Sequence, residues 1–301
     1  MILVTGTKRS GTSMWMQILR AGGVPLFGEA FPLGWGASIR EANRRGFYES
    51  MLRHGIYWRT NPHPKTGAYF FPEQVERHGV KVFIPGLVRT DRAYIGRVVA
   101  TMRHWREYRA SLLRMRAMER SSAEQAGTAL PEPRRRLDPV LEWWTENFML
   151  VRDIATRRYP VHVTTYDRLL AEPRAEIDAV FGWLGVGPLD RDAATRAVDA
   201  AQRSATRADD ADETDDNPTW ADHVAVFDAL YAAVHEGSGL DGTLLDALNR
   251  THAALLPAIE ADRRAARRPG ELRFSPAPPV RDGVWMDVDH FDAGDHFDDD
   301  E

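Results

Sequence analysis

The chain opens with cationic and hydroxyl side chains that could bind a phosphate or sulfate group. Residues 6–13 read Gly-Thr-Lys-Arg-Ser-Gly-Thr-Ser and directly follow the short apolar run of residues 2–5. Lys8 and Arg9 carry full positive charges. A glycine-rich turn that leads into a helix also presents backbone N–H groups and the positive end of the helix dipole. Because these features occur in this order, the segment predicts an anion site between a first strand and a first helix.

The position of the cations separates this loop from the loops of nucleotide-hydrolysing enzymes. In the Walker A pattern, the second glycine is followed at once by a Lys that reaches the transferred phosphate. Gly6 and Gly11 have the Walker spacing, but Thr12 stands where that Lys is required. The loop therefore predicts phosphate binding without nucleotide hydrolysis. The alternative is an ordinary strand-to-helix turn with incidental cations.

Three later segments bring further candidate side chains to the ends of predicted strands. Lys81 lies in one strand, Arg103 directly follows another, and Tyr166 ends a third. In an open parallel sheet, ligands bind beyond the carboxyl ends of the strands. We therefore expect these side chains to meet the loop at one edge of the sheet.

The hydrophobic pattern predicts alternating strands and helices. The predicted strands are residues 2–5, 80–84, 97–102 and 160–166. Helices are predicted after Ser10, which could cap the first of them, and over residues 105–120, 140–158, 172–184, 220–236 and 240–265. This alternation predicts an α/β fold of the P-loop-like three-layer α/β/α kind, with a central parallel sheet of about four to five strands flanked by helices.

Composition sets outer limits on what the protein can be. The 301 residues include no cysteine, which excludes disulfides, thiolate zinc sites and cysteine nucleophiles. No apolar run is long enough for a transmembrane helix, and no secretory signal is visible, so we expect a cytoplasmic protein without a membrane span. Length and pattern predict one domain over residues 1–268.

The predicted C-terminal tail, residues 269–301, holds much of the negative charge. Residues 281–301 contain nine Asp or Glu and one Arg, so the rest of the chain is mildly cationic. That balance suits an anionic ligand but is too weak to indicate a nucleic-acid partner. Asp-His-Phe-Asp occurs at 289–292 and 295–298, but its spacing does not fit an EF-hand. We therefore predict a disordered acidic tail and no metal site.

Taken together, the loop and Arg103 resemble motifs of the sulfotransferases that use 3′-phosphoadenosine-5′-phosphosulfate. The family's loop reads Lys-Ser-Gly-Thr-Thr after a first strand, and this chain has Arg9-Ser-Gly-Thr-Ser13. The family also has an Arg followed eight residues later by a Ser, and Arg103 and Ser111 keep that spacing. The resemblance covers residues 1–205.

Three shorter motifs extend the resemblance. Lys81-Val-Phe-Ile-Pro85 is similar to the family's Lys-x-His-Leu-Pro, but without the His. The segment that begins at Tyr166 and ends at Pro173 is similar to Tyr-Glu-Asp-Leu followed by Pro. Gly46-Phe-Tyr-Glu49 is similar to bacterial members that read Gly-Tyr-Tyr-Glu or Gly-Phe-Trp-Glu.

The resemblance implies a transferase that moves a sulfuryl group in line from 3′-phosphoadenosine-5′-phosphosulfate, its co-substrate, to a hydroxyl or amine. It implies that Lys81 neutralises the sulfuryl oxygens, that Arg103 and Ser111 bind the donor's 3′-phosphate, and that Tyr166 lies near the adenine. No metal is required. The residues implied for the 5′-phosphosulfate are Lys8, Arg9, Ser10, Gly11, Thr12 and Ser13. Whether Lys8 or Arg9 faces the leaving oxygen stays open.

Phe83 stands where many members have a catalytic His, so a proton acceptor must come from elsewhere or be unnecessary. We predict Glu49 for this role, with a pKa raised by Phe47 and Tyr48. A surface ion pair of Glu49 with an arginine at 44 or 45 is the alternative. Four histidines are rival bases, and of these we expect His104 to lie nearest the donor; the other three are His54, His63 and His78.

Two other functions remain possible from the sequence. One is a P-loop kinase-like phosphotransferase, which would need Mg²⁺ and the late Lys. The other is a catalytically inert nucleotide-binding or interaction protein. The acceptor is not named by any motif: residues 25–72 are rich in Gly, Pro and aromatics and predict a loop-rich wall for a small-molecule, glycan or lipid acceptor. The oligomeric state is not predicted.

Overall fold

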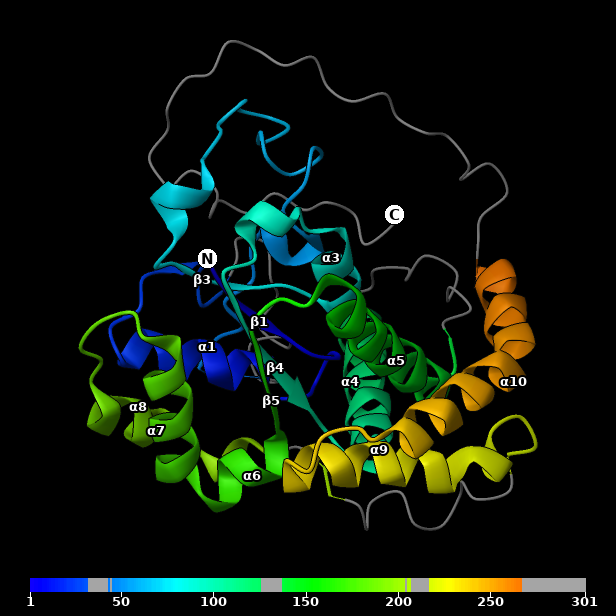
Figure 1. The fold of residues 1–301 in the computed structure, drawn as a ribbon. Helices are drawn as coiled ribbons and strands as arrows, with labels where there is room; N and C mark the ends of the chain where they lie inside the picture. Colours follow the sequence, from blue (N-terminus) through cyan, green and yellow to red (C-terminus); the bar gives the residue numbers. More distant parts are fainter. Residues whose placement is uncertain (32–42, 44, 126–136, 204, 207–216, 267–301) are drawn as a thin grey trace.

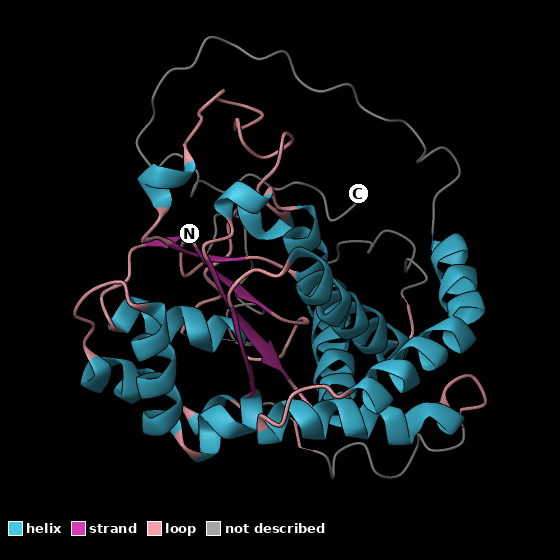
Figure 2. Ribbon diagram, in the orientation of Figure 1, coloured by secondary structure: helices cyan, strands magenta, loops and turns pink. Residues whose placement is uncertain are grey.

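The computed structural model describes residues 1–31, 43, 45–125, 137–203, 205–206 and 217–266. Its centre is a sheet of five parallel strands in the order β2-β3-β1-β4-β5, with helices on both faces (Figures 1 and 2). The predicted three-layer α/β/α class is confirmed. The strands are β1 (Ile2–Thr5), β2 (Leu26–Phe27), β3 (Gly79–Lys81), β4 (Arg97–Met102) and β5 (Val161–Thr165).

Strand β1 is the middle strand, and its side chains are buried on both faces. Val4 pairs with Lys81 of β3 on one side and with Val99 of β4 on the other. Leu3 joins the core under one face, whereas Ile2 and Val4 join the core under the opposite face. This alternation accounts for a strand that is apolar throughout, as expected for a parallel sheet covered by helices.

Helices cover the two faces unequally. One face packs against α1 (Thr12–Ala21), α7 (Pro173–Leu184) and α8 (Arg191–Ala197). The opposite face carries α3 (Ile84–Arg89) and α5 (Pro139–Arg157). The short helix α6 (Tyr166–Ala171) follows β5 directly.

A third core lies beyond the sheet among four helices. It packs the rings of Trp105, Trp143, Trp144 and Phe227 together. Figure 1 shows the long helices α4 and α5 beside each other and α9 and α10 along the lower right of the molecule. The remaining helices of this core are α4 (Trp105–Gln125), α9 (Val224–Glu236) and α10 (Gly242–Ala266).

Several boundaries differ from the sequence prediction for identifiable reasons. The predicted strand 80–84 ends at Lys81, because Pro85 lies in the first turn of α3, where proline is favoured. The predicted helix 172–184 starts at Pro173 for the same reason, with α6 before it. The predicted cap by Ser10 is wrong: Gly11 is the N-cap of α1, with no side-chain cap. Strand β2 and helix α8 were not predicted.

Helix α4 runs five residues past its predicted end, to Gln125. Residues 126–136, which follow this helix, lie outside the described residues, as does the predicted acidic tail 269–301. None of the helices in the described part of the chain is long and apolar enough to cross a membrane.

Candidate active site

The loop after β1 is a closed turn fastened to the end of β4. Thr101 Oγ1 donates to the carbonyl of Ser10 at 2.9 Å, and Ser10 Oγ donates to the carbonyl of Thr7 at 2.7 Å. Arg9 and Gly11 have positive φ angles of 67° and 97°. The left-handed turns direct the loop into α1, whose first amides have no partner inside the helix. The predicted anion loop therefore has the backbone form that such a site requires.

Tyr166, at the end of β5, packs directly on this loop. A Cβ added at Gly11 would lie 2.6 Å from Cδ2 of the Tyr166 ring, so only glycine fits there. The guanidinium of Arg103 lies 5.0 Å from the centroid of the same ring. Burial raises the pKa of the Tyr166 hydroxyl, although three nearby arginines oppose this shift. Residues from the ends of β1, β4 and β5 thus meet at one edge of the sheet.

Lys81, the last residue of β3, is buried and fully engaged. Its Nζ donates to Oε1 of Glu49 at 2.5 Å, to Oγ of Ser13 at 3.2 Å and to the carbonyl of Phe47 at 3.3 Å. Burial lowers the pKa of Lys81, and the Glu49 carboxylate opposes this shift. Lys81 therefore contacts both the anion loop, through Ser13, and Glu49, the predicted base.

Glu49 does not pair with Arg45, one of the two arginines that the sequence offered as its alternative partners. Glu49 is buried, with 8% of the residue exposed. Its carboxylate pairs with Lys81, and its Oε2 lies 3.9 Å from Nε of Arg53. Arg45 pairs with Asp199 at 3.4 Å, and residue 44 lies outside the described residues. A surface pair between Glu49 and Arg45 is therefore wrong. The role of Glu49 as a base stays a prediction.

The two loop cations point to different parts of the site. Lys8 Nζ lies 5.6 Å from the ring centroid of Phe83, and Lys81 Nζ lies 5.8 Å from the same ring. Arg9 instead donates from Nε to Oγ of Ser111 at 3.1 Å. Lys8 thus lies with Lys81 against the Phe83 ring, whereas Arg9 contacts Ser111 while its charge still acts on Lys81.

Arg103 and Arg9 form a second cationic cluster. Arg103 Nη1 donates to the carbonyl of Arg9 at 3.1 Å, its Nη2 to the carbonyl of Ala205 at 2.7 Å, and its Nε to Glu107 at 3.2 Å. Burial is the largest cause that lowers the pKa of Arg9, followed by the charge of Arg103. Two guanidinium groups this close favour an anion between or beside them.

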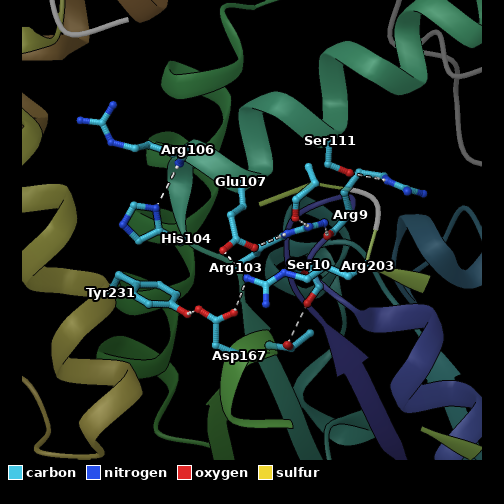
Figure 3. Close-up of polar contacts among 12 residues, drawn as sticks. Arg9, Ser10, Arg103, His104, Arg106, Glu107, Ser111, Asp167, Arg203 and Tyr231 are labelled. Atoms are coloured by element: carbon cyan, nitrogen blue, oxygen red, sulfur yellow. Dashed lines mark hydrogen bonds and ion pairs between the residues drawn. The ribbon is translucent and has the colours of Figure 1, made fainter. Parts of the chain in front are cut away.

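Behind Arg103 lies a network of charged residues that the sequence did not indicate (Figure 3). Glu107 is fully buried and accepts from Arg203 at 2.6 Å as well as from Arg103. Arg203 also bridges to Asp167 at 3.0 Å, and Tyr231 donates to that carboxylate at 2.7 Å. The network holds the guanidinium of Arg103 in one orientation.

The expectation that His104 lies nearest the donor site is not supported by its geometry. Its Nδ1 accepts from the backbone of Arg106 at 3.3 Å, and its Nε2 lies 3.2 Å from Asp228. The ring faces Tyr231, away from the loop (Figure 3). The ring of His54 instead contacts Phe83, with the ring centroids 6.3 Å apart.

The sequence contains a local indication for some residues of this charged network but not for others. Glu107 stands four residues after Arg103 in a predicted helix, which is the spacing of a helical ion pair. Asp167 follows Tyr166 directly. Arg203 comes from a segment with no motif, and its distance in sequence from Glu107 hides the contact. Within the described ranges, no group of three or more His, Cys, Asp or Glu residues is placed to hold a metal ion.

No protein-family model matches the chain, and no curated protein matches it. Its function must therefore be inferred from the geometry of the site and from the motifs in its own sequence.

Proposed function

We propose that the protein is a sulfotransferase that transfers the sulfuryl group of 3′-phosphoadenosine-5′-phosphosulfate to a hydroxyl or amine. One observation carries the proposal. Two cation clusters flank a single anion loop at the carboxyl edge of the sheet, one around Lys81 and Lys8 and the other around Arg9 and Arg103. A ligand with anionic groups at two ends suits this arrangement, whereas a simple phosphate would need only one cluster.

The donor's nucleotide end suits the cluster of Arg9, Arg103 and Ser111. A 3′-phosphate would accept charge-assisted hydrogen bonds from these groups, each worth about 1.5–3 kcal/mol. Contacts with described residues use three of the five N–H groups of Arg103. Two donors thus stay available on that side chain for phosphate oxygens. Tyr166, beside Gly11 and Arg103, stands where the resemblance implies a ring near the adenine.

The sulfuryl end suits the loop residues and the Lys81 cluster. The amides of residues 8–13 with Ser10, Thr12 and Ser13 would surround the 5′-phosphosulfate, and Lys81 would neutralise charge that develops on the transferred oxygens. The position of Lys8 above Phe83 favours Lys8 over Arg9 as the cation beside the leaving oxygen. Catalysis would rest on positioning and charge stabilisation, with no covalent intermediate on the protein.

Aromatic side chains around the Lys81 cluster favour an acceptor with an apolar body. The rings of Phe47 and Phe83 lie 5.9 and 5.8 Å from Lys81 Nζ. They would exclude water from the reacting atoms, which strengthens electrostatic interactions there.

A thermal-shift experiment tests the proposal at the donor. Adenosine 3′,5′-bisphosphate without Mg²⁺ should raise the melting temperature, and adenosine 5′-monophosphate should do so only weakly. Stabilisation by ATP with Mg²⁺, and none by the bisphosphate, would contradict the proposal and favour the kinase alternative.

A further inference from the structure

We infer that Glu146 of α5 accepts the proton of the acceptor, while Glu49 serves to hold Lys81. This inference rests on the proposed sulfuryl transfer. Phe83 replaces the His of many members, and Glu49, the base predicted from the sequence, already contacts Lys81 at 2.5 Å. A carboxylate that holds a buried ammonium is restrained in the geometry that the ammonium needs. This restraint makes a second, unpaired carboxyl group the better proton acceptor.

Glu146 lies on the face of α5 that contacts the site. Three residues earlier, Trp143 donates from its indole Nε1 to the main-chain carbonyl of Arg103 at 2.8 Å. Positions three apart on a helix lie side by side. Glu146 therefore projects from the face of α5 that meets the carboxyl end of β4, where Arg103 begins the turn into α4.

The Glu146 carboxyl is largely surrounded by protein but has no polar partner among the described residues. Among the described residues it makes no ion pair or hydrogen bond, and its side chain is only partly exposed. Lys8 of the anion loop is close enough for its charge to act on this carboxyl. The negative charge of Glu146 helps to raise the pKa of Tyr108 in α4, although burial is the largest cause of that shift. An acid that is reachable by solvent, surrounded by protein and next to a loop cation is placed as the wall of a ligand site.

The charges around Glu146 suit a group that gains and loses a proton near neutral pH. Burial raises its pKa to about 8, and the charge of Glu142 on the same helix acts in the same direction. Lys8 from the loop and Arg263 from α10 oppose the shift. A base works best when its pKa lies near the working pH. Two carboxyl groups with distinct environments and distinct tasks are a recurrent device of active sites.

The reaction balances as follows. The acceptor oxygen or nitrogen forms a bond to sulfur while the bond from sulfur to the bridging oxygen of the donor breaks. The electron pair of that broken bond stays on the 5′-phosphate of adenosine 3′,5′-bisphosphate, beside Lys8. The proton of the acceptor moves to the Glu146 carboxylate and leaves to solvent after the product departs.

The first test needs no substrate and measures the ionisation of Glu146. A carboxyl whose pKa is raised on folding costs stability progressively as the pH rises from about 4.5 to about 8. Glu146→Gln cannot ionise. The melting temperature of the variant minus that of the wild type should therefore increase across this pH range and stay constant above it. A constant difference between the two proteins from pH 5 to pH 9 would overturn the inference and leave the proposed function untouched.

The second test measures turnover as the gain of one sulfuryl group by products in a cell extract incubated with the donor. Glu146→Gln should bind adenosine 3′,5′-bisphosphate normally and lose ~10²- to 10⁴-fold in turnover. Turnover equal to wild type would overturn the role of Glu146. Normal bisphosphate binding with no product from the wild type would instead overturn the transferase proposal, and this inference with it.

Glu142→Gln is the matched control, one turn earlier on α5. Glu142 pairs with Arg116 at 3.2 Å and acts on Glu146 only through its charge. Its removal should shift the midpoint of the turnover–pH profile to lower pH without a loss at the plateau. Glu49→Gln should lower the plateau and keep the midpoint. A Glu142→Gln profile that keeps the wild-type midpoint would contradict Glu146 as the titrating group.

Discussion

Arg9 donates a hydrogen bond from its Nε to the hydroxyl of Ser111 at 3.1 Å, although 102 positions separate the two residues. The contact joins the anion loop after β1 to the second turn of α4. It brings together the two motifs that the resemblance assigns to opposite ends of one donor, the 5′-phosphosulfate and the 3′-phosphate. Of the two loop cations, Arg9 is thus the one next to Arg103 and Ser111, the residues proposed to bind the 3′-phosphate.

Removal of Arg103 should abolish selection for the 3′-phosphate. Arg103→Ala deletes the guanidinium beside Arg9 and Ser111, so the affinity for adenosine 3′,5′-bisphosphate should fall by ~10- to 100-fold. Affinity for adenosine 5′-monophosphate should change little. Calorimetry with both nucleotides measures the difference, and equal losses for both would remove Arg103 from this role.

Arg157 provides the matched control for that variant. Like Arg103, it pairs with one carboxylate, that of Asp153, and donates to two main-chain carbonyls, those of Thr90 and Leu87. Arg157→Ala should therefore cost comparable stability but leave nucleotide selectivity unchanged. A loss of selectivity in this variant would show that unfolding, rather than the missing phosphate contact, explains the result for Arg103.

The pair of Lys81 and Glu49 should behave as a coupled unit in stability. Each single variant, Lys81→Met or Glu49→Gln, leaves one buried group without its partner, which costs about 3–5 kcal/mol. The double variant should cost less than the two single variants added together. Urea unfolding of all four proteins measures the coupling energy, expected at about 0.5–3 kcal/mol. Strict additivity would contradict a direct interaction.

Gly11→Ala should impair both the backbone and the nucleotide site. The residue has a φ of 97°, and an added Cβ would lie 2.6 Å from the Tyr166 ring. The strain costs about 1–3 kcal/mol, and the displaced ring should weaken bisphosphate binding. Gly23→Ala is the control, because Gly23 has a φ of 95° and nothing within 4 Å of an added Cβ. It should lose stability but keep binding, so equal binding losses would contradict the role of Tyr166.

Glu176 should account for part of the stability lost in acid. Burial alone would raise its pKa, but the hydrogen bond with His162 at 3.1 Å and the charge of Arg168, whose Nη2 lies 3.1 Å from Oε2, lower it below 4.5. A lowered pKa contributes stability above about pH 4.5 that disappears as the pH falls further. The stability gap between wild type and Glu176→Gln, measured by chemical unfolding, should narrow below that pH. A gap that stays constant down to pH 3 would refute this account.

The sequence was sufficient for the strands because their signals are local. Residues 2–5 and 97–102 form strands with the predicted bounds, since each is a short apolar run followed by a turn. The meeting of Lys81, Arg103 and Tyr166 with the loop also followed from one rule, that parallel strands present their carboxyl ends at one edge. Strand β2 is only two residues long, too short to produce a pattern.

The sequence could not predict which side chains pair with one another. Glu49 was expected among aromatics, and the structure adds Lys81 as its ion-pair partner, which depends on how residues 46–50 approach β3. His104 follows Arg103 in sequence, but the turn into α4 directs its ring towards Asp228. Arg203 reaches Glu107 only because a distant segment returns to the sheet edge. Such choices are set by tertiary packing rather than by residue spacing.

The central position of β1 gives the proposed nucleotide binding a thermodynamic consequence. Because the loop that follows this strand is fastened to β4 through Thr101 and joined to β3 through Lys81, the site exists only when both neighbours have paired with β1. A ligand held there binds the folded chain and not its partly folded forms. At a free concentration of about one hundred times its Kd, such a ligand adds about 2.7 kcal/mol to the free energy of unfolding. The co-substrate would then also protect the protein against unfolding and proteolysis, so the lifetime of the protein would depend on the supply of its donor.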